Sequence, residues 1–258
     1  MLKFENSNIS IQFPTESNGG LNQDEEYIIV EEQGSDTPRK IRFHDYHEIY
    51  SIPGLYEHLF YEKLKCQSPS TISDMMQREL ENLPMEPSDL VVLDVGAGNG
   101  MVGEQLNRLG IKSVVGIDII EEAAQAVERD RPEVYDDYYV ADLTRLSDDT
   151  RQELRDKQFN CMVSVSALGF GDIPPQAFAE AYNLVSTPGL VAFNIKEEFV
   201  GNQDASGFSR LIDRLIESEM FQPSAKERYQ HRLGVDSKPL YYVAMVGEKQ
   251  GDIPAEWL

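Results

Sequence analysis

The sequence predicts an α/β protein: a doubly wound, seven-stranded sheet at residues 90–258, preceded by an α+β cap at residues 1–89. From Leu90 onward, strand-like and helix-like segments alternate, which is typical of a parallel sheet covered by helices on both faces. A turn with three glycines at alternate positions follows the first strand directly. Near the end of the chain, two strand-like segments are separated only by the turn 234–239, which predicts an antiparallel hairpin.

The elements of the sheet region are assigned from apolar and β-branched runs and from the glycine, proline and polar residues between them. The first strand begins at Val91, and six more are predicted at residues 113–118, 134–140, 159–165, 190–195, 220–233 and 240–247. Helices are predicted to begin at about Asn99 and to cover residues 121–130, 148–157, 176–185 and 207–218.

The cap does not continue this alternation. Two of its segments alternate apolar and polar residues as strands do, and a third is predicted to pair with the second as a hairpin: 8–13, 27–32 and 41–50. A helical pattern begins near Gly54. A second helix is predicted from Ser70 or Thr71 to Leu83, with Ser70 as its N-terminal cap.

The turn after the first strand is the strongest functional signal of the chain. From Asp94 to Gly100 it reads Asp-Val-Gly-Ala-Gly-Asn-Gly. Glycine lets the backbone approach a ligand without an intervening Cβ, and the helix that follows presents free N–H groups and a positive dipole end. Two ligand classes compete, because Gly98, Gly100 and Gly103 also fit the Gly-x-Gly-x-x-Gly turn of dinucleotide enzymes.

The spacing Asp94-x-Gly96-x-Gly98-x-Gly100 resembles motif I of the class I S-adenosylmethionine-dependent methyltransferases. In that family the turn lies against the amino-acid end of the cofactor. The acid at Asp94 suits this interpretation, because a carboxylate attracts an ammonium group and repels a pyrophosphate. The resemblance implies a Rossmann-like methyltransferase sheet, S-adenosylmethionine as the cofactor, and a cap that packs over the cofactor face.

Two further acids follow strand ends in the order of that family, so the resemblance is specific over residues 90–143. Asp118 ends the second strand about 20 residues after the turn, where an acid can accept hydrogen bonds from ribose hydroxyls. After the third strand, the resemblance implies that Asp142 meets the adenine amino group and that Leu143 packs on the ring. The implied cofactor residues are Asp94, Gly96, Ala97, Gly98, Asn99, Gly100, Asp118, Ile119, Asp142, Leu143 and Ser164.

A narrower resemblance rests on residues 56–69 and on the loop Gly169-Phe-Gly-Asp172-Ile-Pro-Pro175. These segments are similar to the methyltransferase-like proteins related to the Williams–Beuren syndrome region methyltransferase. That group carries a histidine where this chain has Asp172, so a histidine base at this position cannot be transferred. The predicted acceptor site combines cap aromatics with this loop: Tyr56, Phe60, Tyr61, Phe170 and Asp172.

Composition narrows the choice of partners. The net charge is −22 and no cluster of lysine and arginine stands out, which disfavours nucleic acid as the acceptor. No apolar run reaches the roughly 18 residues of a membrane span, and no signal peptide is recognised, so a cytoplasmic location without a membrane is expected. With two cysteines and four scattered histidines, no metal site is predicted and no catalytic residue is assigned.

The acceptor is expected to be a small molecule or a protein side chain, and the oligomeric state stays open. The motif Asn-Pro-Pro-Tyr, which amino-group methyltransferases carry after the fourth strand, is absent from the sequence. Two alternatives to a methyltransferase are kept. One is a regulatory or interaction module that binds S-adenosylmethionine without turnover, and the other is an NAD-dependent oxidoreductase.

Overall fold

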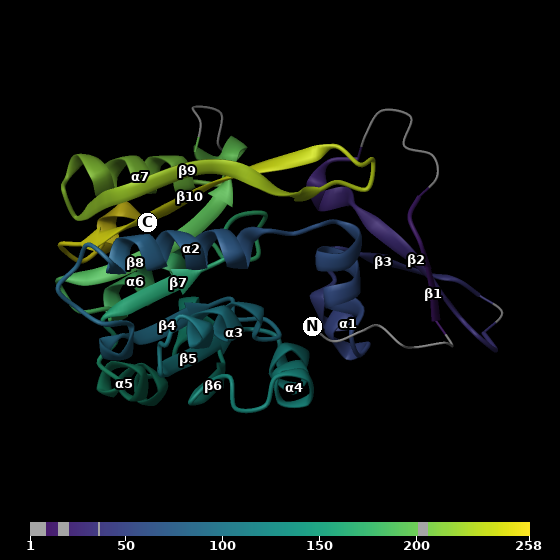
Figure 1. Cartoon of the computed structure of the whole chain (residues 1–258), viewed down its shortest axis with the longest axis horizontal. Helices are drawn as coiled ribbons and strands as arrows, with labels where there is room; N and C mark the ends of the chain where they lie inside the picture. The colour runs from purple at the N-terminus through teal and green to yellow at the C-terminus, as the bar shows by residue number, and fades with distance from the viewer. Residues whose placement is uncertain (1–8, 15–20, 36, 201–205) are drawn as a thin grey trace.

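The computed structural model describes residues 9–14, 21–35, 37–200 and 206–258, and its main sheet has seven strands in the order β6-β5-β4-β7-β8-β10-β9 (Figure 1). Strands β4 to β8 are parallel, and β10 runs antiparallel to both β8 and β9. This order confirms the doubly wound sheet and its antiparallel C-terminal hairpin. The strands are β4 (Val91–Val95), β5 (Ser113–Asp118), β6 (Asp137–Val140), β7 (Cys161–Ser164), β8 (Gly189–Lys196), β9 (Phe221–Leu233) and β10 (Pro239–Lys249).

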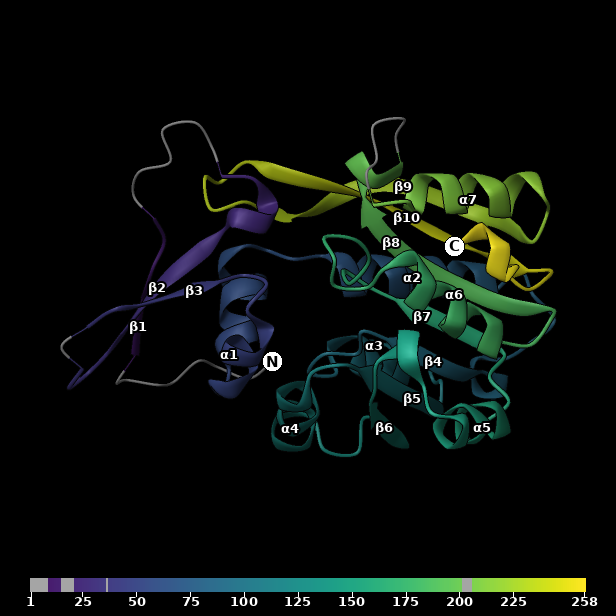
Figure 2. The ribbon, with the colours of Figure 1, turned by 180° about the vertical axis from the view of Figure 1, so that it is seen from behind.

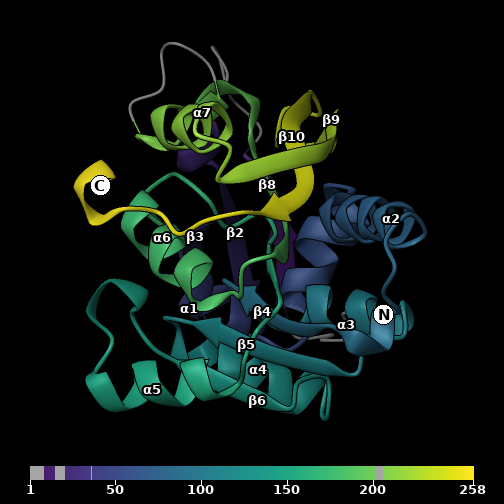
Figure 3. The same cartoon turned by 90° about the vertical axis from the view of Figure 1, so that its left-hand side faces the viewer.

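Helices cover both faces of the sheet, because alternate strand residues point to opposite sides (Figure 3). Val92 packs with α2 (Ser68–Leu80) and α3 (Met101–Arg108). Leu93 packs with the helices of the other face, which are α5 (Asp148–Asp156), α6 (Pro175–Leu184) and α7 (Phe208–Glu217). α4 (Glu121–Asp130) contacts β5 and β6. Among the described residues, none of these helices is both long and apolar enough to cross a bilayer.

The cap lies beyond the carboxyl ends of the parallel strands (Figures 1 and 2). It contains a small antiparallel sheet with its own apolar core, around Ile28, Ile41 and Leu59. Its elements are β1 (Ile9–Gln12), β2 (Tyr27–Glu32), β3 (Arg39–Arg42), α1 (Tyr46–Ser51) and the π-helix η2 (Glu57–Lys63). The described 3₁₀ turns of the chain are Gln23–Glu25, Pro87–Asp89, Leu143–Arg145, Glu197–Val200 and Ala255–Trp257.

Several contacts hold the cap to the long β9–β10 hairpin, and two of them come from neighbouring residues of β9. The buried Arg232 of β9 donates from Nη2 to Glu26 Oε2 at 2.5 Å. The backbone N–H of Leu233 donates to the Leu64 carbonyl at 2.7 Å. The last helix of residues 1–89, α2, packs on β8, β9 and β10 of the main sheet. The cap is therefore held against the main sheet, at the edge where the carboxyl ends of the parallel strands lie.

Within the cap, two sequence predictions were wrong. The segment 41–50 does not pair throughout as a strand, because pairing with β2 ends at Arg42 and α1 begins at Tyr46. Tyr46, Ile49 and Tyr50 recur at helical spacing and pack inward, which the assumption of a strand overlooked. α2 begins at Ser68, and the hydroxyl of Ser70 donates to the Gln67 carbonyl at 2.9 Å instead of capping the helix.

Other boundaries moved by a few residues. α3 begins at Met101 instead of Asn99, because Gly98 and Gly100 adopt φ angles of 53° and 83° that a helix does not allow. β6 begins at Asp137 instead of residue 134, since the N–H of Val134 bonds back to the Arg131 carbonyl in a turn.

Candidate functional site

A cavity of about 370 Å³ lies between the cap and the carboxyl ends of the parallel strands. This volume is in the range of small-molecule sites, and the position is where open α/β sheets bind ligands. The wall combines the turn after β4, the ends of β5 and β6, the loop after β7 and side chains of the cap. Its predicted cofactor residues are Gly96, Ala97, Gly98, Asn99, Asp118, Ile119, Asp142 and Leu143.

The glycine turn is packed tightly from two sides. Gly96 and Gly98 adopt φ angles of 71° and 53°. A Cβ on Gly96 would lie 2.6 Å from the Cβ of Ala167, in the loop after β7. A Cβ on Gly98 would lie 2.5 Å from the hydroxyl of Tyr50, in the cap. Both positions therefore require glycine, for conformation and for space.

Asp118 connects this turn to the end of β5. Its Oδ2 accepts a hydrogen bond from the N–H of Gly98 at 2.9 Å, and its Oδ1 accepts from the N–H of Ile120 at 3.0 Å. Burial raises the pKa of this carboxyl above its ordinary value. Beside it, Ile119 lines the cavity although 61% of its surface is exposed. The two carboxylate oxygens of Asp118 can accept hydrogen bonds, and the exposed side chain of Ile119 offers an apolar surface beside them. Together they suit a ligand that carries both hydroxyls and an apolar ring.

Asp142 lines the cavity two residues after the end of β6, the strand that pairs with β5. Its Oδ1 accepts from the N–H and the hydroxyl of Thr144, at 2.9 and 2.6 Å. These hydrogen bonds hold the pKa of the carboxyl below its ordinary value, so Asp142 is ionised at neutral pH. Leu143 follows it and adds an apolar contact surface to the same wall.

Three predicted cofactor residues are not part of the cavity wall: Asp94, Gly100 and Ser164. Asp94 is fully buried and accepts from the Tyr135 hydroxyl at 2.7 Å, while its Oδ1 has no partner among the described residues. Burial raises the pKa of Asp94 to about 7. The hydroxyl of Ser164 donates to the Val95 carbonyl at 3.1 Å, and Gly100 precedes α3. These residues stabilise the glycine turn without lining the cavity.

The acceptor residues expected from the sequence are divided between two neighbouring spaces. Tyr61 lines the main cavity, Phe60 and Phe170 line a smaller pocket of about 30 Å³ beside it, here called the inner chamber, and Tyr56 lines both. Asp172 lines both. Sequence analysis missed two further tyrosines of the main cavity, Tyr46 and Tyr50, which α1 directs toward it.

His44 is a second omission from the sequence-based site. It lies in the turn between β3 and α1, and its Nδ1 is 2.8 Å from Oδ2 of Asp172 in the loop after β7. Like Asp172, it lines both the main cavity and the inner chamber. The two residues are 128 positions apart, so no local motif could have announced their pairing.

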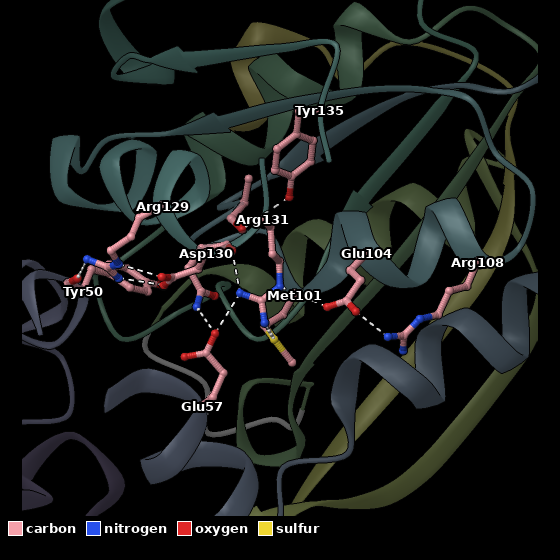
Figure 4. Close-up of polar contacts among 11 residues, drawn as sticks. Tyr50, Glu57, Met101, Glu104, Arg108, Arg129, Asp130, Arg131 and Tyr135 are labelled. Atoms are coloured by element: carbon pink, nitrogen blue, oxygen red, sulfur yellow. Dashed lines mark hydrogen bonds and ion pairs between the residues drawn. The ribbon is translucent and has the colours of Figure 1, made fainter. Parts of the chain in front are cut away.

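A buried ionic cluster joins the cap to the glycine turn (Figure 4). Arg131, after α4, donates from Nη1 to Glu57 Oε1 at 2.7 Å and to the Asn99 carbonyl at 3.1 Å. The Asn99 side-chain amide also donates to Glu57 Oε1, at 2.9 Å. Arg131 Nε donates to Glu104 Oε2 at 3.0 Å. Glu57 is the cap's member of this cluster and is fully buried.

Comparison with known proteins shows what the sheet region is similar to. Residues 93–193 match the family model of a methyltransferase domain. A search of curated proteins finds no relative of this chain. Over these residues the chain is similar to a methyltransferase domain, and its cofactor is S-adenosylmethionine. This finding leaves the dinucleotide interpretation of Gly98, Gly100 and Gly103 without support.

Solved structures agree on the fold. The N-methyltransferase NodS from Bradyrhizobium japonicum is 11% identical, with a TM-score of 0.53, over 81% of this chain and 98% of its own. An S-adenosylmethionine-dependent methyltransferase from Clostridium acetobutylicum is 12% identical, with a TM-score of 0.51, over 76% of this chain and 97% of its own. At these identities the likeness concerns the fold alone.

Proposed function

We propose that this enzyme transfers the methyl group of S-adenosylmethionine to a small molecule, or to a single protein side chain, enclosed between the sheet and the cap. One observation carries the proposal: a single cavity runs from the glycine turn and the acids after β5 and β6 to the cap tyrosines, His44 and Asp172. Cofactor-type and acceptor-type residues therefore face the same enclosed space.

The residues of the wall fit the cofactor. The turn at Gly96 and Gly98 borders the cavity, and it keeps its shape only while both positions lack a Cβ, so it is assigned to the amino-acid end of the cofactor. Each carboxylate oxygen of Asp118 accepts one backbone N–H and keeps acceptor capacity for a ribose hydroxyl. Asp142 is assigned to the adenine amino group, and Leu143 and Ile119 to its apolar surroundings. The bound cofactor supplies an electrophilic methyl group, and the protein orients the acceptor toward it.

The acceptor side favours a small ligand. Tyr46, Tyr56 and Tyr61 enclose the cavity from the cap, and Asp172 brings a carboxylate into it. A net charge of −22 opposes a polyanionic acceptor. The proposed acceptor wall consists of Tyr56, Tyr61 and Asp172, with Phe60 and Phe170 bordering the inner chamber.

We also infer a closer relationship to the methyltransferase-like proteins of the Williams–Beuren group, and a functional division into residues 1–89 and 90–258. The support for the relationship is the loop Gly169–Pro175, whose Ile-Pro-Pro end starts α6 and whose Asp172 enters the cavity. The support for the division is that the acceptor-type aromatics come from the cap.

The test combines calorimetry of S-adenosylmethionine binding with transfer of a labelled methyl group to metabolite and protein pools. Wild type should bind the cofactor and label an acceptor. Gly98→Val should lose binding by more than about 100-fold, because its side chain would fill the turn and meet Tyr50. Gly34→Val is the matched control, since Gly34 also has a positive φ but no atom of the described residues, its chain neighbours aside, within 4 Å of the added Cβ.

Each outcome separates two interpretations. Cofactor binding without any labelled product would favour a regulatory module over an enzyme that turns over. Wild-type affinity in a folded Gly98→Val variant would mean that the cofactor does not use this turn.

A further inference from the structure

We propose that His44, oriented by Asp172, is the general base of the transfer, and that the acceptor is a hydroxyl on an aromatic ring. The inference rests on the proposed function and names the substrate class of the same site. It begins from the pairing of His44 with Asp172 across two separate elements.

The pairing selects the tautomer of the neutral imidazole. Nδ1 of His44 is 2.8 Å from a carboxylate oxygen of Asp172, which can only accept while it is ionised. In neutral His44 the proton therefore stays on Nδ1, and Nε2 carries the free lone pair. Among the described residues, no hydrogen bond engages Nε2. The side chain is 17% exposed and lines the cavity, so an acceptor can reach it.

The surroundings of His44 suit a planar ring. Its own ring lies 5.2 Å from that of Phe170 and 5.8 Å from that of Tyr46, measured between centroids. Tyr56 continues the aromatic wall on the cap side. Aromatic side chains at these distances pack favourably edge-on or offset against another ring. A neutral base with a free lone pair calls for an acceptor that carries a proton, such as a hydroxyl.

The inner chamber points to a second polar group on the acceptor. Gln23 Oε1 and Ser166 Oγ border it, and both are buried without a partner among the described residues. Gln23 is held in place by its amide, which donates to the Tyr242 hydroxyl at 2.8 Å. An unpaired buried acceptor is unfavourable, and a chamber of about 30 Å³ has room for one hydroxyl. The geometry thus favours an aromatic ring with two hydroxyls.

The chemical step balances without a further reagent. A lone pair of the acceptor oxygen forms the bond to the methyl carbon, the carbon–sulfur bond breaks with its electron pair on sulfur, and the acceptor proton passes to Nε2 of His44. Asp172 stabilises the resulting imidazolium and is a positioning residue, because it acts through His44. Positioned general bases contribute about 10²–10⁴-fold to rate.

The experiment uses catechol, resorcinol and hydroquinone as probes with S-adenosylmethionine, and then the nitro derivative of whichever is methylated fastest. His44→Gln should lower kcat for the unsubstituted compound by about 10²–10⁴-fold while leaving cofactor affinity unchanged. The loss should be much smaller for the nitro derivative, because a more acidic phenol ionises without help. The matched control is His47→Gln, a change at an exposed histidine of α1.

Nitrogen NMR provides a readout that does not depend on turnover. The imidazole of His44 should show the Nδ1-protonated tautomer in wild type and lose that preference in Asp172→Ala. Asp172→Asn retains an acceptor oxygen and should preserve part of the activity that Asp172→Ala loses.

The proposal is overturned if wild type binds the cofactor but methylates none of the three probes. It is also overturned if His44→Gln loses no more activity than His47→Gln, or loses equally with both members of the nitro pair. Failure of wild type to bind S-adenosylmethionine would instead contradict the proposed function itself.

Discussion

The two sides of the cavity are built in different ways. On the cofactor side, the contacts that define the site join residues close in sequence. For example, the N–H of Gly98 donates to the carboxylate of Asp118, 20 residues away, at 2.9 Å. On the acceptor side, side chains from distant elements meet, as in the pair of His44 with Asp172, 128 residues apart, or of Gln23 with Tyr242, 219 residues apart. The cofactor side therefore forms with the sheet, whereas the acceptor side forms only when the cap docks.

One cluster makes the two sides depend on each other. Arg131 bridges Glu57 of the cap and Asn99 of the glycine turn (Figure 4). Arg129 adds a second link, since its Nη1 donates to the Tyr50 carbonyl of α1 at 3.1 Å. If the cap were an independent module, these contacts would be dispensable for the sheet.

The largest effect should come from Arg131→Met. This change leaves the Glu57 carboxylate fully buried with its positive partner removed, and its Oε2 already has no partner among the described residues. Breaking one side of a buried ion pair costs about 3–5 kcal/mol, so the free energy of unfolding should fall by that amount. Urea denaturation measures it, and loss of the Asn99 contact should weaken cofactor binding as well.

Two controls isolate the buried pair. Arg78→Met breaks the Arg78–Glu227 contact of 2.6 Å, whose side chains are 58% and 45% exposed, and should change stability by at most about 1 kcal/mol. The double variant Arg131→Met with Glu57→Gln removes both charges and should recover part of the loss. Equal, small effects of Arg131→Met and Arg78→Met would mean that the cap docks without this cluster.

The same difference explains what could be predicted from the sequence. Asp118 could be predicted from its position at the carboxyl end of a parallel strand, where open α/β sheets bind ligands. Asp142 could be predicted from the resemblance to the methyltransferase family, and both residues line the cavity. His44 could not be found, because its partner depends on how the cap docks on the loop after β7. Tyr46 and Tyr50 were also missed as cavity residues, because residues 41–50 were predicted to be a strand, whereas Tyr46–Ser51 form a helix.

Asp94 should make the stability of the cofactor side depend on pH. Burial raises its pKa from 3.8 to about 7 in the folded chain. Between these values the folded state binds more protons than the unfolded state, so stability should fall as pH rises. A shift of this size corresponds to about 4 kcal/mol across the window.

Urea unfolding of the ligand-free protein at about pH 4 and pH 8 measures this effect as the difference between wild type and Asp94→Asn. The variant keeps an oxygen for the Tyr135 hydroxyl but has no proton to lose. It should gain stability relative to wild type as pH rises. A difference that stays constant with pH would show that Asp94 does not titrate in this range. Asp118, whose pKa burial also raises, is present in both proteins, so the comparison isolates the change at Asp94.

The smallest of these effects should come from Asp118→Ala, which tests whether the cofactor side recognises the ribose directly. The change removes a carboxylate acceptor and should weaken S-adenosylmethionine by about 1.5–3 kcal/mol, or roughly 10- to 150-fold. Calorimetry provides the affinities, and Asp74→Ala, at an exposed acid of α2, is the control.

Asp118 also accepts from the N–H groups of Gly98 and Ile120, so its removal could loosen the turn without any ribose contact. A cofactor analogue without ribose hydroxyls separates the two causes. If the carboxylate binds those hydroxyls, the analogue should bind wild type and Asp118→Ala almost equally, because neither complex contains the contact. If Asp118→Ala weakens binding of the analogue as much as it weakens binding of the natural cofactor, Asp118 acts through the turn alone. The ribose must then be recognised elsewhere on the cavity wall.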